Sequence, residues 1–430
     1  MSTHVNQEKA RPVVMIAGAG LGGLLLAILL EQINIPYHIF ERSKELRTFG
    51  GLMTLGASIL PVFEQLGLLE DLMKLSKVYK CMKVYGADMT ELVNYERTFL
   101  KEVLGYHNIL FAKPKLYELL LKQVPADKIS LNKKVLNIKE ENGRVIIQCS
   151  DSTSYEGDIL IGADGSYSGV RQSLYKSLDE QGLLPKADLE EFSIAYTLMV
   201  GVADTKDPEK YPELNEPYVT LAAVIGGNYR TLSQNDSKSQ HFRNSEWGPE
   251  SNDTMIKKFQ DCISPLGGTM GNHINDTPKD LISKVYLEEK LFKTWHHGRT
   301  VLIGDAAHKM HPAAGLGAVN AFQDAVILAN CLYEMKDNSL QSITSAFKEY
   351  YTQRYDHVQA QCNRSHRLAK AIFGQTLIER VMRHIMFKYM PASLVNRAAV
   401  KSLEYHPKIA WLPPAKNTSS VPHDENKNGN

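Results

Sequence analysis

Two glycine-bearing motifs far apart in the chain carry residue types that could hold a phosphorylated ligand. The first, residues 13–23, reads VVMIAGAGLGG and places three glycines at Gly18, Gly20 and Gly23. The first glycine permits a tight turn, the second lets backbone approach a pyrophosphate, and the third allows a helix to pack closely on a sheet. Free N–H groups and the helix dipole favour an anion at the start of that helix. The motif therefore predicts a phosphate-binding turn between a buried strand and a helix.

An acidic residue stands where such a turn requires one. Residues 37–40, YHIF, read as a second strand, and Glu41 follows it 18 positions beyond Gly23. A carboxylate at about this distance hydrogen-bonds a ribose. Strand, turn, helix and acid together predict a dinucleotide site, with an ordinary glycine-rich turn as the alternative. Arg42 comes next and is either a second ligand contact or a solvated surface charge.

The second motif, residues 300–308, reads TVLIGDAAH, a buried strand that ends in Gly-Asp. Asp305 can accept hydrogen bonds from the hydroxyls of a ribityl chain, or it can cap the following segment. Two binding elements so far apart predict one long cofactor held at both ends, and FAD is such a cofactor.

A loop over residues 312–319, PAAGLGAV, is expected to lead into a helix that starts at Asn320. Small residues would let a flat ring system lie against backbone, and the helix N-terminus would stabilise negative charge on that ring. We expect ring contacts from Pro312, Gly317, Ala318 and Val319.

Composition excludes several classes of function. The 430 residues are 43% hydrophobic with a net charge of +1, which suits a large core and two domains but not a dedicated nucleic-acid binder. Five scattered cysteines without a CxxC pattern predict free thiols in a reducing compartment. Residues 1–12 lack an apolar signal region and no segment is long and apolar enough to span a bilayer, so we expect a cytoplasmic protein. His308 and His311 have no acid or cysteine to complete a metal site, and we predict no metal.

The order of apolar runs predicts an α/β fold interrupted by an insert. A βαβ unit covers 13–41, a glycine-rich crossing covers 49–57, a helix follows over 59–75, and helical patterns dominate 315–400. The predicted parts are a discontinuous cofactor domain over 11–75, 106–185 and 290–345, a β-rich substrate domain over 76–105 and 186–289, C-terminal helices over 346–412 and a disordered tail over 413–430.

Three motifs in this order resemble the single-component flavoprotein monooxygenases of the para-hydroxybenzoate hydroxylase type. They are residues 18–23, residues 158–171 (DILIGADGSYSGVR) and the Gly-Asp pair at 304–305, and the resemblance covers most of the chain. Residues 56–68 and 315–320 look most like the fungal subgroup that includes paxilline-pathway epoxidases. The resemblance implies a GR2-type Rossmann-like FAD domain with an inserted β-sheet substrate domain.

The same resemblance implies an activity. Non-covalent FAD would be reduced by NADPH, O2 would add at the flavin C4a, and the hydroperoxide would hydroxylate or epoxidise a small apolar or aromatic substrate. No second GxGxxG motif is present, so NADPH would bind without a Rossmann domain of its own. Two rivals remain: an FAD-dependent reductase or dehydrogenase without oxygen transfer, and a catalytically impaired flavin-binding protein.

Several site residues follow from the resemblance. Asp164 belongs to a motif that serves both FAD and NADPH, and Arg171 pairs either with NADPH phosphates or with Asp164. Lys113 stands where the family usually has Arg, which keeps the charge but loses the bidentate fork. Tyr196 or Thr197 stands where the subgroup often carries a catalytic Arg.

The remaining expectations concern contacts beyond these motifs. Gly51 and Gly56, in the glycine-rich crossing, are expected to contact the cofactor, and Tyr229 is a second candidate catalytic side chain beside Tyr196. The helix over 373–390 has apolar residues at helical spacing with basic residues on its other faces. It either caps the protein or rests weakly on a membrane surface. We expect a monomer or homodimer.

Overall fold

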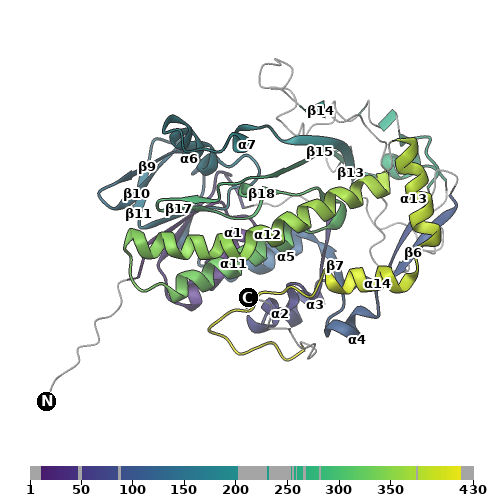
Figure 1. Ribbon diagram of the computed structural model, residues 1–430, viewed down its shortest axis with the longest axis horizontal. Coiled ribbons are helices and arrows are strands. Elements are labelled where there is room, and N and C mark those ends of the chain that lie inside the picture. Colours follow the sequence, from purple (N-terminus) through teal and green to yellow (C-terminus); the bar gives the residue numbers. More distant parts are fainter. Residues whose placement is uncertain are drawn as a thin grey trace, which may run out of the picture.

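The computed structural model describes residues 11–46, 51–85, 89–201, 230–231, 253, 256–257, 259–264, 268–279, 282–373 and 376–417 (Figure 1). Its centre is a six-stranded sheet in the order β16-β17-β12-β1-β2-β8. These strands are β1 (Val14–Ala17), β2 (Tyr37–Phe40), β8 (Ile129–Ser130), β12 (Ile159–Gly162), β16 (His296–His297) and β17 (Thr300–Leu302). All neighbours are parallel except β16 and β17.

The central strands are short and apolar because both faces of the sheet are covered. Every residue of β1 and β12 is buried, which is the pattern of a parallel sheet between two layers. Helices α1 (Leu21–Gln32) and α11 (Gly317–Glu334) pack against each other on one face. Nine of the twelve residues of α1 are buried, so its apolar run belongs to the core.

The opposite face of the central sheet carries a small antiparallel sheet and a helix (Figure 1). The strands β9 (Val135–Glu141), β10 (Arg144–Cys149) and β11 (Ser154–Gly157) pair in the order β11-β10-β9. Helix α6 (Gly169–Glu180) packs against β9 and β17. The sheet is therefore enclosed between helices and an antiparallel meander, and the α/β Rossmann-like fold expected from the sequence is confirmed.

A second sheet, in the order β14-β13-β15-β18, belongs mostly to the β-rich insert. It consists of β13 (Ser193–Gly201), β14 (Arg230–Thr231), β15 (Ile282–Leu291) and β18 (His308–Lys309). The last of these strands comes directly after the Gly-Asp motif, so the motif lies where the two sheets meet. Two further sheets have the orders β3-β7-β4 and β5-β6, from β3 (Leu52–Leu55), β4 (Lys77–Val78), β5 (Cys81–Tyr85), β6 (Glu91–Glu96) and β7 (Ile109–Ala112).

Two helix boundaries differ from those expected. The single helix expected over 59–75 is two helices, α2 (Leu60–Gln65) and α3 (Leu69–Lys74), because Gly67 adopts a left-handed backbone with φ of 71° and ends the first. Helix α11 begins at Gly317 rather than at Asn320. The preceding turn is the short 3-10 segment η5 (Pro312–Ala314), and Gly315 ends it with φ of 65°.

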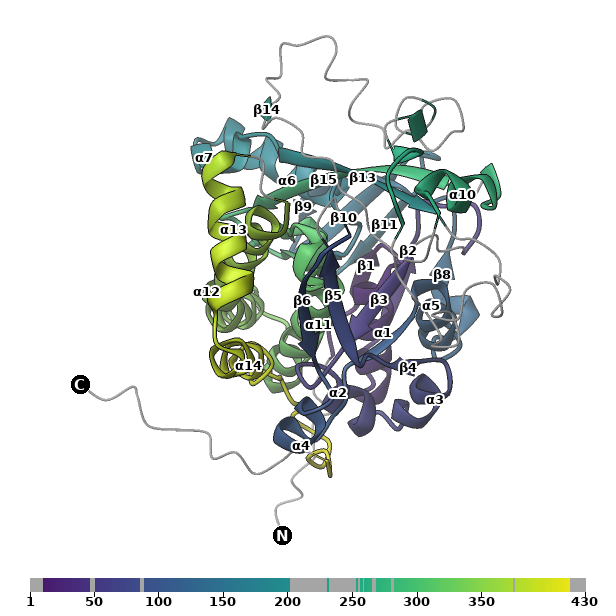
Figure 2. The same cartoon turned by 90° about the vertical axis from the view of Figure 1, so that its right-hand side faces the viewer.

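The other helices cover the edges of the two sheets. Helix α12 (Leu340–Phe373) runs along α11, and α13 (Leu377–Tyr389) and α14 (Ala392–Lys401) follow at the periphery (Figure 2). The described part of the chain contains no helix of sufficient length and apolarity to cross a membrane. The shorter helices are α4 (Leu100–Leu104), α5 (Lys113–Leu121), α7 (Lys186–Leu189) and α10 (Met270–Asn275), with 3-10 segments η1 (Ala126–Lys128) and η4 (Gly304–Ala306).

The chain after α14 returns to helix α2 and is held there through side-chain hydrogen bonds. Gln65 Nε2 donates to the Pro413 carbonyl over 3.0 Å, and the Ile409 N–H donates to Gln65 Oε1 over 2.9 Å. The Lys416 N–H donates to Glu64 Oε1 over 3.2 Å. The first residues of the expected tail, 413–417, are therefore part of the described structure, and residues 418–430 lie outside it.

Candidate cofactor site

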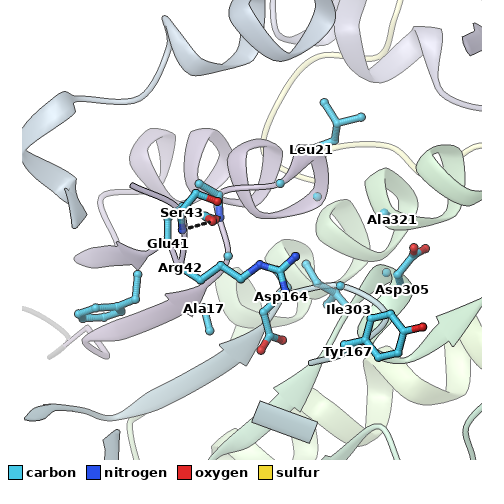
Figure 3. A pocket seen from close by; sticks show the side chains of 18 of the residues that line it. Ala17, Leu21, Glu41, Arg42, Ser43, Asp164, Tyr167, Ile303, Asp305 and Ala321 are labelled. Carbon is cyan, nitrogen blue, oxygen red and sulfur yellow. Dashed lines mark hydrogen bonds between the residues drawn. The ribbon is translucent and has the colours of Figure 1, made fainter. Parts of the chain in front are cut away.

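The candidate site lies at the edge of the central sheet where four parallel strands end. Gly18 follows β1, Glu41 follows β2, Asp164 comes two residues after β12, and Gly304 and Asp305 come two and three residues after β17. The carboxyl ends of parallel strands meet at one edge, and ligands bind in the crevice outside it. A cavity of about 400 Å³ occupies this edge and is lined by residues from all four strand ends (Figure 3).

The three glycines of the first motif have distinct environments. Gly18 has φ of 107°, a conformation that side chains disfavour, and a Cβ there would lie 2.5 Å from the Ala163 carbonyl oxygen. A Cβ on Gly23 would lie 2.2 Å from the Gly18 carbonyl oxygen, so this glycine is required by helix–strand packing. A Cβ on Gly20 would meet only the Ala163 oxygen, at 4.0 Å. Gly20 lines the cavity, and its open side therefore faces the space available to a ligand.

Glu41 is held in place by backbone donors next to the turn. The Ala19 N–H donates to Glu41 Oε2 over 2.8 Å, and the Ser43 N–H donates to Oε1 over 2.9 Å. Each carboxylate oxygen has two acceptor sites, so both oxygens keep one for another donor. Glu41 and Arg42 both line the cavity, with Arg42 exposed. The position suits a carboxylate that binds ribose hydroxyls.

Asp305 lies at the other end of the cavity and belongs to an ionic cluster. Its Oδ2 accepts from Lys309 Nζ over 2.5 Å and from Ser166 Oγ over 3.2 Å. Burial acts to raise the pKa of Asp305, but the charge of Lys309 and its hydrogen bond outweigh burial and lower the pKa. Asp305 therefore stays an anionic acceptor.

Lys113 lines the same end of the cavity as a partly exposed cation at the start of α5. Burial lowers the pKa of Lys113, while the charge of Asp305 opposes that shift. The Lys113 N–H donates to the Gly51 carbonyl over 3.1 Å, which ties the start of α5 to the residue that precedes β3. A cation is thus available where the cavity meets the Gly-Asp motif at residues 304–305.

Asp164 caps α6 with one oxygen and leaves the other without a partner. Its Oδ2 accepts from the Gly169 N–H over 2.7 Å and from the Val170 N–H over 3.2 Å. Its Oδ1 is buried and has no hydrogen-bond partner among the described residues. Burial raises the pKa of this carboxyl. A buried oxygen without a partner at the cavity wall is a free acceptor for a ligand hydroxyl or water.

The hydrogen bonds of Arg171 run to backbone carbonyls, and its expected contact with NADPH phosphates stays a prediction. Arg171 is 5% exposed, and its guanidinium donates to the carbonyls of Ala306, over 2.9 Å, and Ser166, over 2.6 Å. It also lies 4.1 Å from the centroid of the Phe292 ring. The buried position lets Arg171 connect residues 158–171 with the Gly-Asp motif at residues 304–305.

The structure separates some predicted site residues from the cavity. Gly317 and Ala318 line it, and a Cβ on Gly317 would meet nothing within 4 Å. Val319 points into the core at 4% exposure, since it falls on the inner side of α11. Pro312 is exposed and is not among the lining residues.

The other four predicted site residues are two glycines and the two candidate catalytic tyrosines. Gly51 and Gly56 are not in its lining, and Gly56 packs against Asn108, whose Oδ1 a Cβ would approach to 2.1 Å. The backbone of Tyr196 lies in β13 opposite Leu287. Tyr229 lies outside the described residues.

A buried polar network behind the Gly-Asp motif was not anticipated. Asp324, on α11, accepts from the Gly304 N–H over 2.9 Å, lies 2.5 Å from His308 Nε2, and accepts from Arg354 Nε over 2.8 Å. The side chains of His308, Asp324 and Arg354 are fully buried. Burial acts to raise the pKa of Asp324, but His308 and Arg354 outweigh it and lower the pKa to about 2. The network fixes the turn that presents Asp305.

A signal for this network was present in the sequence. Asn320, Gln323 and Asp324 share one face of an otherwise apolar helix, at spacings of three and four residues. Arg354 Nη2 donates to Asn320 Oδ1 over 2.8 Å, and Nη1 donates to Gln323 Oε1 over 3.1 Å. Polar residues on a buried helix face predict a partner, although the pattern does not say which.

The residues present fit FAD. Gly20 and Gly317 leave open backbone for the pyrophosphate and the ring, Glu41 keeps free acceptor sites for the ribose, and Asp164 carries an oxygen without a partner. Figure 3 shows Glu41 and Asp305 on opposite sides of the cavity with Asp164 between them, an arrangement suited to an extended ligand. Within the described residues, no group of three or more His, Cys, Asp or Glu side chains is placed to hold a metal.

Comparison with known proteins agrees with this geometry. Residues 11–365 match the model of the FAD binding domain family. The FAD-dependent monooxygenase ausM of Penicillium brasilianum is 28% identical over 440 residues, covering 96% of this chain and 90% of that protein. The FAD-dependent monooxygenase nvfK of Aspergillus novofumigatus is 29% identical and covers 76% of this chain and 71% of that protein.

Solved structures share the fold. Klebsiella pneumoniae HpxO complexed with FAD and uric acid superposes with a TM-score of 0.70 at 19% identity, covering 92% of this chain and 97% of that one. The 2,6-dihydroxypyridine-3-hydroxylase of Arthrobacter nicotinovorans superposes with a TM-score of 0.65 at 16% identity, covering 96% of this chain and 100% of that one. The family match spans the whole cavity lining and all three motifs, so this chain belongs to the FAD binding domain family.

Proposed function

We propose that this FAD-dependent monooxygenase takes electrons from NADPH and uses O2 to hydroxylate or epoxidise a small apolar or aromatic compound of the secondary-metabolite kind. The observation that carries the proposal is the cavity that has Glu41 at one end and Asp305 at the other, which suits one extended flavin dinucleotide. The fungal monooxygenases similar over most of this chain support the substrate class. The likeness of residues 56–68 and 315–320 to the paxilline-pathway subgroup points the same way.

Bound FAD supplies the chemistry of accepting a hydride and activating oxygen, and the protein supplies binding and orientation. The glycine turn receives the pyrophosphate on the N–H groups that open α1. Glu41 would accept hydrogen bonds from the adenosine ribose, and Asp305 would accept them from the ribityl chain. These two anchors fix the distance over which the cofactor must extend.

Helix α11 provides the electrostatic element of the proposed site. It begins at Gly317, is 18 residues long and has no acidic residue in its first turn. The first four N–H groups of a helix have no partner within the helix, and its dipole places positive charge there. Because Gly317 and Ala318 line the cavity, this positive end would stabilise negative charge on a reduced ring.

Isotope incorporation tests the proposal. The purified FAD-loaded protein would be screened for substrate-stimulated NADPH oxidation with phenols, indoles and terpenoids, and each active compound would be rerun under labelled oxygen gas. A monooxygenase transfers one labelled atom to the product. NADPH oxidation with product formation but without the label would indicate a reductase or dehydrogenase. Absence of NADPH oxidation with every compound, in a protein that retains FAD, would favour an impaired flavoprotein.

A further inference from the structure

Helix α13 exposes its apolar side chains instead of burying them. Leu377, Ile378, Val381, Met382, Ile385 and Tyr389 are 50–72% exposed, and we call these six residues the outer face. Their positions, i, i+1, i+4, i+5, i+8 and i+12, form one stripe along the helix. Leu394 on α14 extends the exposed apolar surface at 53%. Both views place α13 at the periphery of the molecule (Figures 1 and 2).

The opposite side of α13 carries charged groups and faces the protein. Arg383 is half-buried, and its Nη1 donates to the Ile372 carbonyl at the end of α12 over 3.1 Å. Glu379 is half-buried and accepts from the Thr376 N–H over 3.0 Å in a capping box. A helix on the surface of a soluble protein normally has the reverse orientation. The apolar side of α13 therefore faces away from the protein.

The charge around the outer face identifies the kind of surface that suits it. Residues 376–403 contain five Lys or Arg residues, of which Lys388, Arg397 and Lys401 are exposed, and a single acid, Glu379, which caps the helix. Lys388 lies beside the stripe, is exposed, and has its Nζ 5.5 Å from the centroid of the Tyr389 ring. Arg397 and Lys401 on α14 are also exposed. An exposed apolar stripe with a cation beside it, followed by a helix with further exposed cations, suits an apolar layer covered by anionic groups.

We propose that the outer face docks on an anionic lipid surface, with its apolar side chains in the headgroup boundary and Lys388, Arg397 and Lys401 against lipid phosphates and carboxylates. A second copy of this chain would bring a like-charged surface to the same face, and like charges across an interface are unfavourable. Thirteen helical residues span only about 20 Å, less than the hydrocarbon core of roughly 30 Å, so α13 lies in the plane of the surface.

Vesicle flotation of the full-length, FAD-loaded protein tests this docking. One set of vesicles contains phosphatidylcholine alone, and the other contains equal parts of phosphatidylcholine and phosphatidylserine. We expect binding to the acidic vesicles that weakens with added salt, and weaker binding to the neutral ones. Ile378→Glu/Met382→Glu should weaken binding to acidic vesicles at least about tenfold, because two charges would enter the apolar boundary. Leu183→Glu, at an exposed apolar residue elsewhere, is the matched control and should bind as wild type.

A second variant separates charge from apolar contact. Lys388→Glu/Arg397→Glu leaves the stripe intact and should weaken binding to acidic vesicles about tenfold while changing binding to neutral ones little. FAD content and the thermal midpoint verify folding of each variant. Three results would overturn the docking: no flotation of the wild type with either vesicle, equal flotation of the wild type and the outer-face variant, or a wild-type dimer in solution that the outer-face variant converts to a monomer.

Discussion

Replacement of Gly20 and of Gly23 by alanine should separate cofactor binding from folding. Gly20 has an extended backbone, with φ of −74° and ψ of 179°, that any residue adopts, and a Cβ there has no neighbour closer than 4.0 Å. Gly is a better N-cap than Ala, so alanine at this position costs roughly 0.5–1.5 kcal/mol. The loss of a glycine also restricts the unfolded chain, which stabilises by about 0.4–1 kcal/mol. The free energy of unfolding of the apo Gly20→Ala protein should therefore stay within about 1 kcal/mol of wild type.

The same methyl group projects into the cavity where the pyrophosphate would lie. The methyl group would displace the pyrophosphate by about its own radius. This displacement would weaken about two hydrogen bonds to the charged ligand, each worth roughly 1.5–3 kcal/mol. A loss of about 3 kcal/mol corresponds to more than a hundredfold in Kd. Gly20→Ala should therefore bind FAD at least about a hundredfold more weakly.

Gly23→Ala should behave in the opposite way, because its Cβ would lie 2.2 Å from a backbone carbonyl oxygen. Relieving that contact requires the helix to move from the strand, at a cost of about 1–3 kcal/mol or more. Urea denaturation of the apo proteins and fluorescence titration with FAD measure the two effects. Wild-type FAD affinity in Gly20→Ala would refute the placement of the pyrophosphate, and equal destabilisation of both apo variants would refute the distinction between the glycines.

Four other substitutions and conditions test the remaining parts of the site. Glu41→Ala removes a charged acceptor worth roughly 1.5–3 kcal/mol, so the Kd for FAD in a fluorescence titration should rise at least about tenfold, and an unchanged Kd would exclude the ribose role. Asp305→Ala should weaken FAD retention. At saturating FAD it should also slow flavin reduction by NADPH on the order of 100-fold, as measured by stopped-flow absorbance. Wild-type reduction rates in a folded variant would make Asp305 purely structural. The pKa of Asp324 is lowered from 3.8 to about 2, so its stabilising contribution is complete above pH 3.8 and is lost as the pH falls toward 2. Asp324→Asn should flatten the acid denaturation curve of the apo protein over that range, and an unaltered curve would contradict the assignment. Arg354→Met leaves a buried carboxylate without its cation and should cost about 3–5 kcal/mol in urea denaturation, whereas wild-type stability would show that the ion pair is dispensable.

Much of the fold was predictable because its signals are local. The strand–turn–helix at 13–32 follows from an apolar run, glycines and a second apolar run, all within one supersecondary unit. The α/β class and FAD as cofactor are confirmed by the fold and by the family match. The break at Gly67 was missed because apolar residues continue on both sides of it, and only the left-handed backbone of that glycine ends the helix.

The site residues likewise divide into those that local sequence predicts and those whose position depends on tertiary packing. Glu41, Asp164 and Asp305 each follow a buried strand, and the parallel order of the strands brings them to one edge. Pro312 and Val319 lie in the predicted ring-binding loop, but the early start of α11 turns Val319 into the core and leaves Pro312 outside the lining. A shift of three residues in a helix start rotates each side chain by most of a turn, and local sequence does not resolve that shift.

The sequence by itself determined which residues follow buried strands and which helices have an apolar face, because those features depend on neighbours within one or two turns of chain. Only the tertiary structure decided the partners of those residues. Lys309 holds Asp305, Arg354 neutralises Asp324 from the adjoining helix, and Arg171 binds carbonyls instead of a carboxylate. The outward orientation of the outer face was decided in the same way. Periodicity shows that a helix has an apolar side, whereas the packing of distant elements determines the direction in which that side points.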